Sequence, residues 1–233
     1  MVFRNYSFGR FAAIGLFAVV MAMFAVPASA QTLYSNGPID GTVGGWTIGP
    51  ASGGYSVADS FTLSGASTLT GVADIGLWTD PGDTPATVDW SIGTSPFDTS
   101  DGSGTGSLSG SALSPSSAYG IGGYYSVYSE DFTLPSISLG GGTYYLTLSN
   151  ASVGNGDFVF WDENNGPSTA YDNTIGSLYN CDEVSDTSCS ESFQILGTTS
   201  APEPGTLALL GIGLLCLVPL SLRRRGTSVS SAA

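Results

Sequence analysis

Three pairs of aspartates have spacings found in metal-binding turns. The two members of each pair are separated by two or three residues, and the pairs are Asp80 and Asp83, Asp98 and Asp101, and Asp182 and Asp186. Ca²⁺ takes about six to eight oxygen ligands, and turns rich in carboxylates supply them. None of the pairs matches the EF-hand pattern of alternating acidic residues followed by glycine and a distant glutamate. Ca²⁺ binding is therefore one hypothesis, and solvated turn carboxylates are the other.

A second group of residues has the chemistry of a sugar-binding surface. Aromatic rings offer flat apolar faces, and aspartate and asparagine side chains hydrogen-bond to hydroxyl groups. The candidates are Tyr124, Tyr125, Trp161, Asp162 and Asn164. Packing in the core is the favoured interpretation for each of the four tryptophans taken singly, which are Trp46, Trp78, Trp90 and Trp161.

Pairs of carboxylates also raise the question of glycoside hydrolysis. Such an enzyme needs two carboxyl groups that face each other at about 5 Å or at about 6.5–9.5 Å. Asp89, Glu130, Asp131 and Asp162 are available, but any acidic chain offers such pairs by chance. We therefore expect no enzymatic activity, and a carboxylate-dependent glycoside hydrolase is the least favoured alternative.

Cys181 and Cys189 lie eight positions apart in one acidic segment. In an oxidising compartment such a pair is expected to form a disulfide, and two free thiols are the alternative. The closed loop is short, so the bond would contribute only about 2–3 kcal/mol. No basic neighbour is present to lower the thiol pKa, so neither cysteine is expected to be catalytic.

The distribution of charge excludes several functions. The chain has 5 basic and 19 acidic residues, and all five basic residues are arginines near its two ends. Residues 31–201 contain no Lys, Arg or His, whereas they hold every acidic residue except Glu203. Nucleic-acid binding depends on basic side chains, so it is excluded. Mechanisms that need a histidine base, a Schiff-base lysine or an arginine clamp are excluded as well.

Short segments of alternating apolar and polar residues must position these groups. They are bounded by Gly, Pro, Asn and Asp, which is typical of strands and turns. The predicted strands are 32–34, 45–48, 55–63, 68–78, 88–92, 124–134, 143–148, 157–161 and 192–196. The segment Ser100 to Ala118 is rich in Gly and Ser and is predicted to be a flexible loop or hairpin connection. This pattern predicts an all-β fold, a single antiparallel β-sandwich of the jelly-roll kind.

The first thirty residues have the pattern of a signal peptide. Arg4 and Arg10 precede an apolar stretch from Phe11 to Val26, and Ala28-Ser29-Ala30 provides small residues for cleavage. Cleavage there would make Gln31 the first mature residue. An uncleaved N-terminal anchor is the alternative, and either arrangement places the middle of the chain outside the cytoplasm.

The C-terminal region has three parts in order. Pro202-Glu203-Pro204 precedes sixteen uncharged, mostly apolar residues, Leu207 to Leu222, and Arg223-Arg224-Arg225 follows them. A helix of that length spans about 24 Å, slightly less than a bilayer core of about 30 Å. The arginines would stop transfer on the cytoplasmic side. A buried helix of a soluble domain is the alternative interpretation.

This tail resembles that of the PEP-CTERM proteins, which are substrates of exosortase enzymes in Gram-negative bacteria. The match consists of the Pro-Glu-Pro motif at 202–204, the Leu- and Gly-rich apolar run and the arginine cluster at 223–225. The resemblance implies export, temporary anchoring in the inner membrane and cleavage near Pro202 to Pro204. One departure is the extension from Gly226 to Ala233.

The sequence therefore predicts five segments and an exported protein. The segments are a signal peptide (1–30), an acidic β-sandwich (31–197), a linker (198–201), a sorting tail with a transmembrane helix (202–225) and a short polar tail (226–233). The destination is the cell surface or the extracellular matrix, where we expect a structural or adhesive role linked to exopolysaccharide. A carbohydrate-binding module is the alternative.

Overall fold

The computed structural model describes residues 30–40, 44–113, 124–174, 177–180 and 190–199. The chain divides into two compact units, residues 1–198 and residues 199–233, and almost every described residue belongs to the first. Within the described ranges, no helix is long and apolar enough to cross a membrane.

Several predicted features lie outside the described residues. They are the signal peptide, the pair Cys181 and Cys189 with the neighbouring Asp182 and Asp186, the sorting tail with its predicted transmembrane helix, and the polar tail. For these features the predictions from the sequence stand as predictions.

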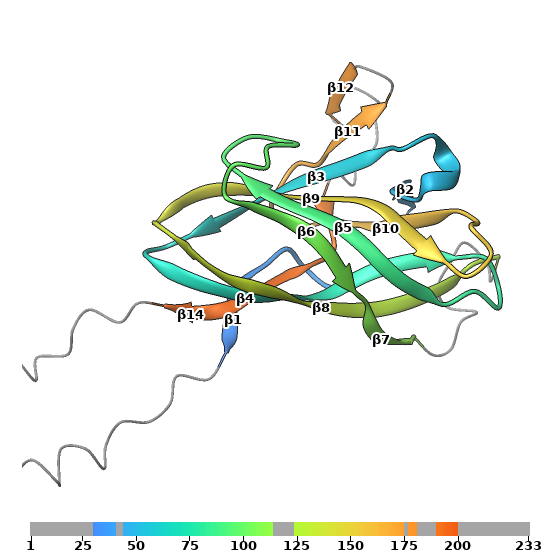
Figure 1. The fold of residues 1–233 in the computed structure, drawn as a ribbon, viewed down its shortest axis with the longest axis horizontal. Coiled ribbons are helices and arrows are strands. Elements are labelled where there is room, and N and C mark those ends of the chain that lie inside the picture. Colours follow the sequence, from blue (N-terminus) through green and yellow to red (C-terminus); the bar gives the residue numbers. More distant parts are fainter. Residues whose placement is uncertain (1–29, 41–43, 114–123, 175–176, 181–189, 200–233) are drawn as a thin grey trace, which may run out of the picture. The chain divides into compact units, whose positions relative to one another are not determined.

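The described chain is almost entirely β structure (Figure 1). One short 3-10 turn, Pro50–Ser52, interrupts it. The strands are β1 (Gln31–Ser35), β2 (Gly45–Thr47), β3 (Ser56–Leu63), β4 (Ser67–Thr79), β5 (Pro85–Gly93), β6 (Gly102–Ser107), β7 (Ser109–Ala112), β8 (Ser126–Leu139), β9 (Gly142–Val153), β10 (Val159–Asn164), β11 (Tyr171–Thr174), β12 (Ser177–Asn180), β13 (Ser190–Glu191) and β14 (Gln194–Thr199).

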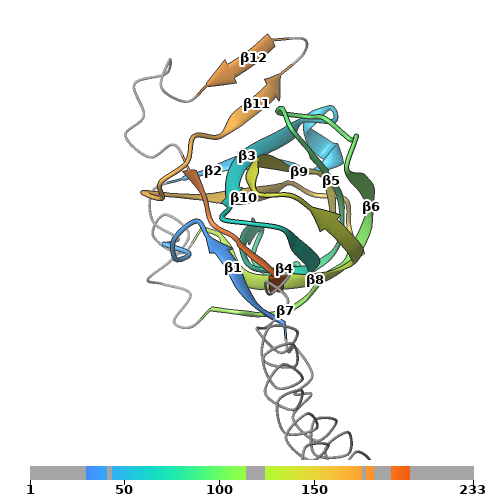
Figure 2. The ribbon, with the colours of Figure 1, turned by 90° about the vertical axis from the view of Figure 1, so that its left-hand side faces the viewer.

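The strands form two antiparallel sheets. The larger sheet has the order β1-β14-β4-β10-β13, with β2 paired to β10 and with β8 and β7 continuing from β4. The smaller sheet has the order β12-β11-β3-β9-β5-β6. Figure 2 shows β3, β9 and β5 of the smaller sheet above β4 and β8 of the larger one. Two antiparallel sheets agree with the predicted β-sandwich, and the jelly-roll version stays a prediction.

One apolar core joins the two sheets. Side chains alternate along the strands, so every second residue of β3 and β9 points inward. Val57 and Phe61 of the smaller sheet and Leu77 and Trp161 of the larger sheet belong to the same buried cluster. Fully burying a side chain of this size stabilises the fold by about 1.5–3 kcal/mol. Trp90 and Trp161 belong to this cluster, which confirms core packing for both. Trp78 is also buried, on the same face of the larger sheet as its register partner Phe160, and Trp46 is half-buried.

The prediction of a flexible loop from Ser100 to Ala118 is wrong over residues 102–112. These residues form β6, which pairs with β5, and β7, which pairs with β8. The glycines of β6 permit this because large rings lie against its backbone. A Cβ on Gly104 would come within 3.2 Å of the Trp90 ring, and one on Gly106 within 2.8 Å of the Phe132 ring. The two rings stack with centroids 6.5 Å apart.

Candidate functional site

An aromatic surface pocket is the best candidate for a binding site among the described residues. Its lining consists of Thr47, Ala51, Tyr55, Tyr125, Phe158 and Phe160, and it is shallow and open to solvent. We call the four rings, Tyr55, Tyr125, Phe158 and Phe160, the aromatic patch. No carboxylate is among the lining residues.

Strand alternation on β10 creates this patch. Trp161 points into the core, so its neighbour Phe160 must point out of the opposite face of the sheet. Phe158 stacks on Phe160 with centroids 6.1 Å apart, and Tyr125 meets Phe160 edge-on at 5.5 Å. Trp78, buried beneath, lies 5.8 Å from Tyr125 and supports it.

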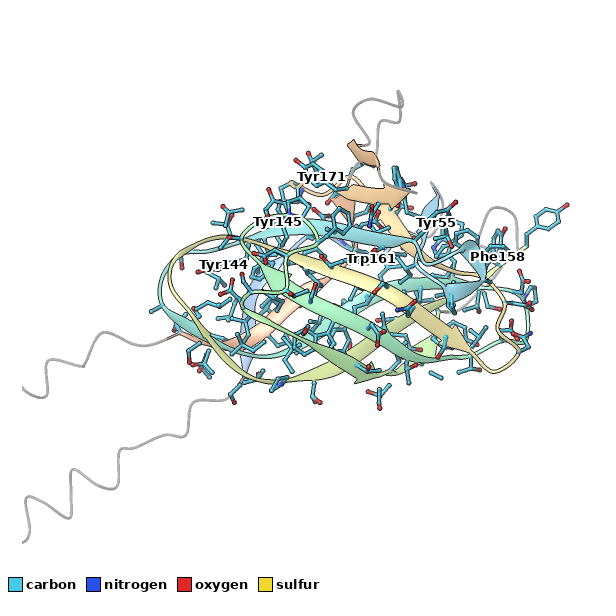
Figure 3. The ribbon with its side chains drawn as sticks, turned by 45° about the horizontal axis from the view of Figure 1, so that its top comes forward. Tyr55, Tyr144, Tyr145, Phe158, Trp161 and Tyr171 are labelled. Atoms are coloured by element: carbon cyan, nitrogen blue, oxygen red, sulfur yellow. The ribbon has the colours of Figure 1, made fainter. Side chains whose placement is uncertain are left out.

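The patch keeps apolar area in contact with solvent. Phe158 is 45% exposed, and Figure 3 shows Phe158 and Tyr55 on the same side of the molecule, away from Tyr144. Ring-to-ring contacts hold Phe158, Phe160 and Tyr125 in place, so a ligand does not have to order these three side chains.

The structure corrects three of the five predicted sugar-binding residues. Trp161 and Asp162 are 0% exposed and Asn164 is 1% exposed, so none of them can present its side chain to a sugar. Tyr125 belongs to the aromatic patch, whereas Tyr124 is 77% exposed and does not line it. The alternation of Phe158 and Phe160 around a core-facing Val159 was the sequence pattern that could have identified the missed rings.

Asp162 and Asn164 have a structural role, because their side chains make buried hydrogen bonds to other segments. The Trp78 Nε1–H donates to Asp162 Oδ1 at 2.7 Å, and the Asp40 backbone N–H donates to Asp162 Oδ2 at 3.0 Å. Asn164 Nδ2 donates to the carbonyl oxygens of Asn36 and Pro38, both at 3.0 Å. These bonds hold the segment after β1 against β10, and that segment covers both side chains.

Asp80 and Asp83 lie together at the surface, as their spacing suggested, and Asp157 joins them from the turn between β9 and β10. Carboxylate oxygens of the three lie within 4.8 Å of one another. We call these three residues the surface triad. The side-chain amide of Asn155 donates to Asp83 at 2.9 Å and to Asp157 at 2.7 Å. The triad is therefore held together by a neutral amide donor.

The second predicted pair, Asp98 and Asp101, has a different role. The Asp98 carboxylate accepts hydrogen bonds from the Ser100 hydroxyl at 2.7 Å, the Ser100 N–H at 2.9 Å and the Thr94 N–H at 3.1 Å. The bonds from Ser100 are the main cause that lowers the pKa of Asp98. Among the described residues, these two aspartates belong to no group of three metal-ligating side chains. Asp98 acts as the cap of a turn.

Of the carboxylates considered for glycoside hydrolysis, Asp89 links neighbouring strands and Glu130 is buried. Asp89 accepts from Thr105 Oγ1 at 2.6 Å and from Asn150 Nδ2 at 2.9 Å, which ties β5 to both neighbouring strands. Glu130 is 2% exposed, and burial followed by the charge of Asp131 raises its pKa to about 7. None of these groups lines the aromatic pocket.

Comparison with known proteins identifies the C-terminal region. A family model described as the PEP-CTERM protein-sorting motif matches residues 200–225. A comparison with curated proteins finds no match to the chain. The match covers the Pro-Glu-Pro residues, the apolar run and the arginine cluster. The chain therefore carries a PEP-CTERM sorting motif, which implies an exported protein that is held briefly in a membrane and processed by an exosortase.

Proposed function

We propose that this protein acts at the cell surface or in the extracellular matrix, where its β-sheet domain adheres to exopolysaccharide through the aromatic patch. The observation that carries the proposal is the surface pocket lined by four aromatic rings, of which Phe158 is exposed and Phe160, Tyr125 and Tyr55 are half-buried. The role is structural or adhesive and does not involve catalysis.

The charge of the domain favours neutral sugars as the contact. Residues 31–201 contain no positive side chain, so an anionic polysaccharide would be repelled unless a cation bridged the two. Aromatic rings bind through their apolar faces and need no opposite charge. The stacked pair Phe158 and Phe160 offers two rings inclined at 22° to each other.

A carbohydrate-binding module that binds one defined oligosaccharide specifically is the alternative. A pocket with fixed polar donors would favour that function, because such groups give specificity. The polar side chain in the lining is that of Thr47, beside the tyrosine hydroxyls of Tyr55 and Tyr125. This small polar set favours adhesion to a repeating polymer.

The test is a binding assay between the purified exported protein and immobilised neutral and acidic polysaccharides. Phe158→Ala removes the most exposed ring of the patch and is expected to weaken binding to a neutral polymer by about tenfold. Tyr124→Ala removes an even more exposed ring that does not line the pocket, so it is the matched control. Equal binding by wild type and Phe158→Ala would remove the patch from the proposal.

We also propose how the sorting tail works. The apolar run 207–222 anchors the protein in the inner membrane with the domain outside the cytoplasm, until cleavage near Pro202 to Pro204 releases it. The length of the run and the arginine cluster 223–225 support this arrangement. A variant that ends before Pro202 should leave the membrane fraction, and its retention there would reveal a second anchor.

A further inference from the structure

Four carboxylates point into the space between the two sheets. Glu163 of β10 and Glu191 of β13 are directly opposite each other in the antiparallel ladder. Asp59 lies on β3 between the core residues Val57 and Phe61, and Asp172 of β11 is the register partner of Val57. Because side chains two apart on a strand share a face, all four carboxylates face inward. We call them the interior acidic cluster.

The cluster is removed from water. Asp59 and Glu191 are 0% exposed, Glu163 is 4% exposed and Asp172 is 7% exposed. Like charges placed directly opposite on neighbouring strands destabilise a sheet, and buried charges without partners cost several kcal/mol. This end of the interior therefore needs a compensating group.

Glu191 has no hydrogen-bond donor on either carboxylate oxygen, and Oδ1 of Asp172 has none. The nearby donors are used elsewhere. Asn36 Nδ2 donates to Asp59 Oδ2 at 2.7 Å and to the Glu191 carbonyl at 2.8 Å, and the Glu191 N–H donates to the same Asp59 oxygen at 2.7 Å. Buried acceptors are nearly always paired in native proteins, so three buried oxygens without donors in one region require an explanation.

The raised pKa values of these acids also indicate that the cluster lacks a compensating positive group. Burial is the largest cause that raises the pKa of Glu191 well above its usual range, followed by the charges of Glu163, Asp59, Asp162 and Asp172. Burial likewise raises the pKa of Asp59 and of Asp172 to about 6. These acids repel one another, and no side chain of residues 31–201 can neutralise them, because that segment has no Lys, Arg or His.

We propose that the interior acidic cluster binds a hard divalent cation of the Ca²⁺ class, with the unpartnered carboxylate of Glu191 as its central ligand. Glu163, Asp59 and Asp172 supply further oxygens from three other strands. Ca²⁺ takes about six to eight such ligands in flexible geometry. The bound ion would supply the positive charge that the sequence of the domain lacks, and it would join the two sheets at this end.

The interior acidic cluster differs from the surface triad in compactness. Among the described residues, the surface triad is the group of three whose ligand atoms lie within 4.8 Å of one another. The glutamates of the interior cluster each have three rotatable side-chain bonds, and binding of an ion would require their carboxylates to turn toward it. This site is independent of the aromatic patch and of its proposed sugar contact.

Protonation of Glu191 is the competing explanation, and calcium titration separates the two. The purified exported protein is treated with a chelator and titrated with CaCl₂ at pH 7, by calorimetry and by thermal unfolding. We expect a raised melting temperature, by about 5–10 °C when free Ca²⁺ exceeds its Kd a hundredfold. Absence of binding, or binding without a thermal shift, would overturn the proposal of an ion that stabilises the fold.

Variants locate the ion. Glu191→Gln keeps the size of the side chain and removes its charge, so it should weaken Ca²⁺ binding at least tenfold and abolish most of the thermal shift. Asp83→Asn is the matched control in the surface triad. It should leave the Ca²⁺ affinity and the thermal shift within about twofold of the wild-type values. The reverse result would place the ion at the surface and overturn the proposal.

A second measurement does not depend on the folding of Glu191→Gln. Tb³⁺ replaces Ca²⁺ and emits when a nearby tryptophan transfers energy to it, and the Trp46 Nε1–H donates to Glu163 of the interior cluster. In the Asp83→Asn variant, excitation of tryptophan should still give Tb³⁺ emission that excess Ca²⁺ removes. Loss of that emission in Asp83→Asn would contradict an interior site.

Discussion

The interior acidic cluster and the surface triad are built from the same functional group in opposite environments. In the surface triad, Asn155 donates to both Asp83 and Asp157, and water reaches the carboxylates. In the interior acidic cluster, both oxygens of Glu191 are buried without a donor. The comparison teaches that the environment, and not the number of carboxylates, decides whether a cluster requires a counter-charge. A compact triad at the surface has no such requirement.

The largest expected effect is a loss of stability with rising pH when divalent cations are removed. Asp59 and Asp172 have pKa values raised to about 6, and Glu130 has a pKa raised to about 7. A raised pKa in the folded state gives stability that is complete below the unfolded pKa, near 4, and is lost as pH rises through the folded pKa. For Asp59 the rise from 3.8 to about 6 corresponds to roughly 3 kcal/mol.

Urea unfolding in the presence of a chelator at several pH values measures whether stability falls or rises with pH. The free energy of unfolding should fall between about pH 4 and pH 7, and added Ca²⁺ should reduce the fall. Asp98 has a lowered pKa, so its contribution is present above the unfolded pKa and is lost only at more acidic pH. Constant or rising stability over this range would mean that the interior carboxylates are not desolvated as described.

The next largest effect is the difference in lost folding stability between a buried and a surface aspartate variant. Asp162→Ala should destabilise the fold by about 2–4 kcal/mol, because the Trp78 Nε1–H and the Asp40 N–H lose their acceptor. Asp157→Ala, in the surface triad, should change stability by no more than about 0.5 kcal/mol. Chemical unfolding of both variants under one condition measures the difference, and equal effects would break the comparison.

The smallest effect is expected within the surface triad itself. Asp83→Asn keeps the backbone carbonyl that accepts from the Tyr128 hydroxyl at 2.8 Å, and it removes only the charge. The free energy of unfolding should change by less than about 0.5 kcal/mol, with or without Ca²⁺. A loss of more than 1 kcal/mol in Ca²⁺, with none in chelator, would show that the surface triad holds a structural ion.

Alternation of apolar residues made most strands predictable. The segments around Trp90, Leu146 and Phe61 each read as a half-buried strand, and each forms one. β6 was missed because its inward positions are glycines, whose apolar partners Trp90 and Phe132 belong to other strands. β11 and β13 are short and polar, so their pairing depends on tertiary contacts that no local pattern reveals.

The sorting tail and the binding surface differ in how far the sequence reveals them. The motif at 200–225 is continuous in sequence, so its residues identify it directly. The aromatic patch combines Tyr55, Tyr125 and Phe160 from separate segments, and only the fold brings them together. Asp162 was a candidate for sugar binding because the segment that covers it lies 122 positions away, where no local pattern reveals the contact.

A crystal structure of the exported protein grown with CaCl₂ would show whether the interior acidic cluster binds an ion. We expect a calcium ion between the two sheets, coordinated by Glu191 with oxygens of Glu163, Asp59 or Asp172. The anomalous signal of the ion would confirm its identity and position. Calcium bound only at Asp80, Asp83 and Asp157, with Glu191 hydrogen-bonded to a neighbouring carboxyl group, would contradict it.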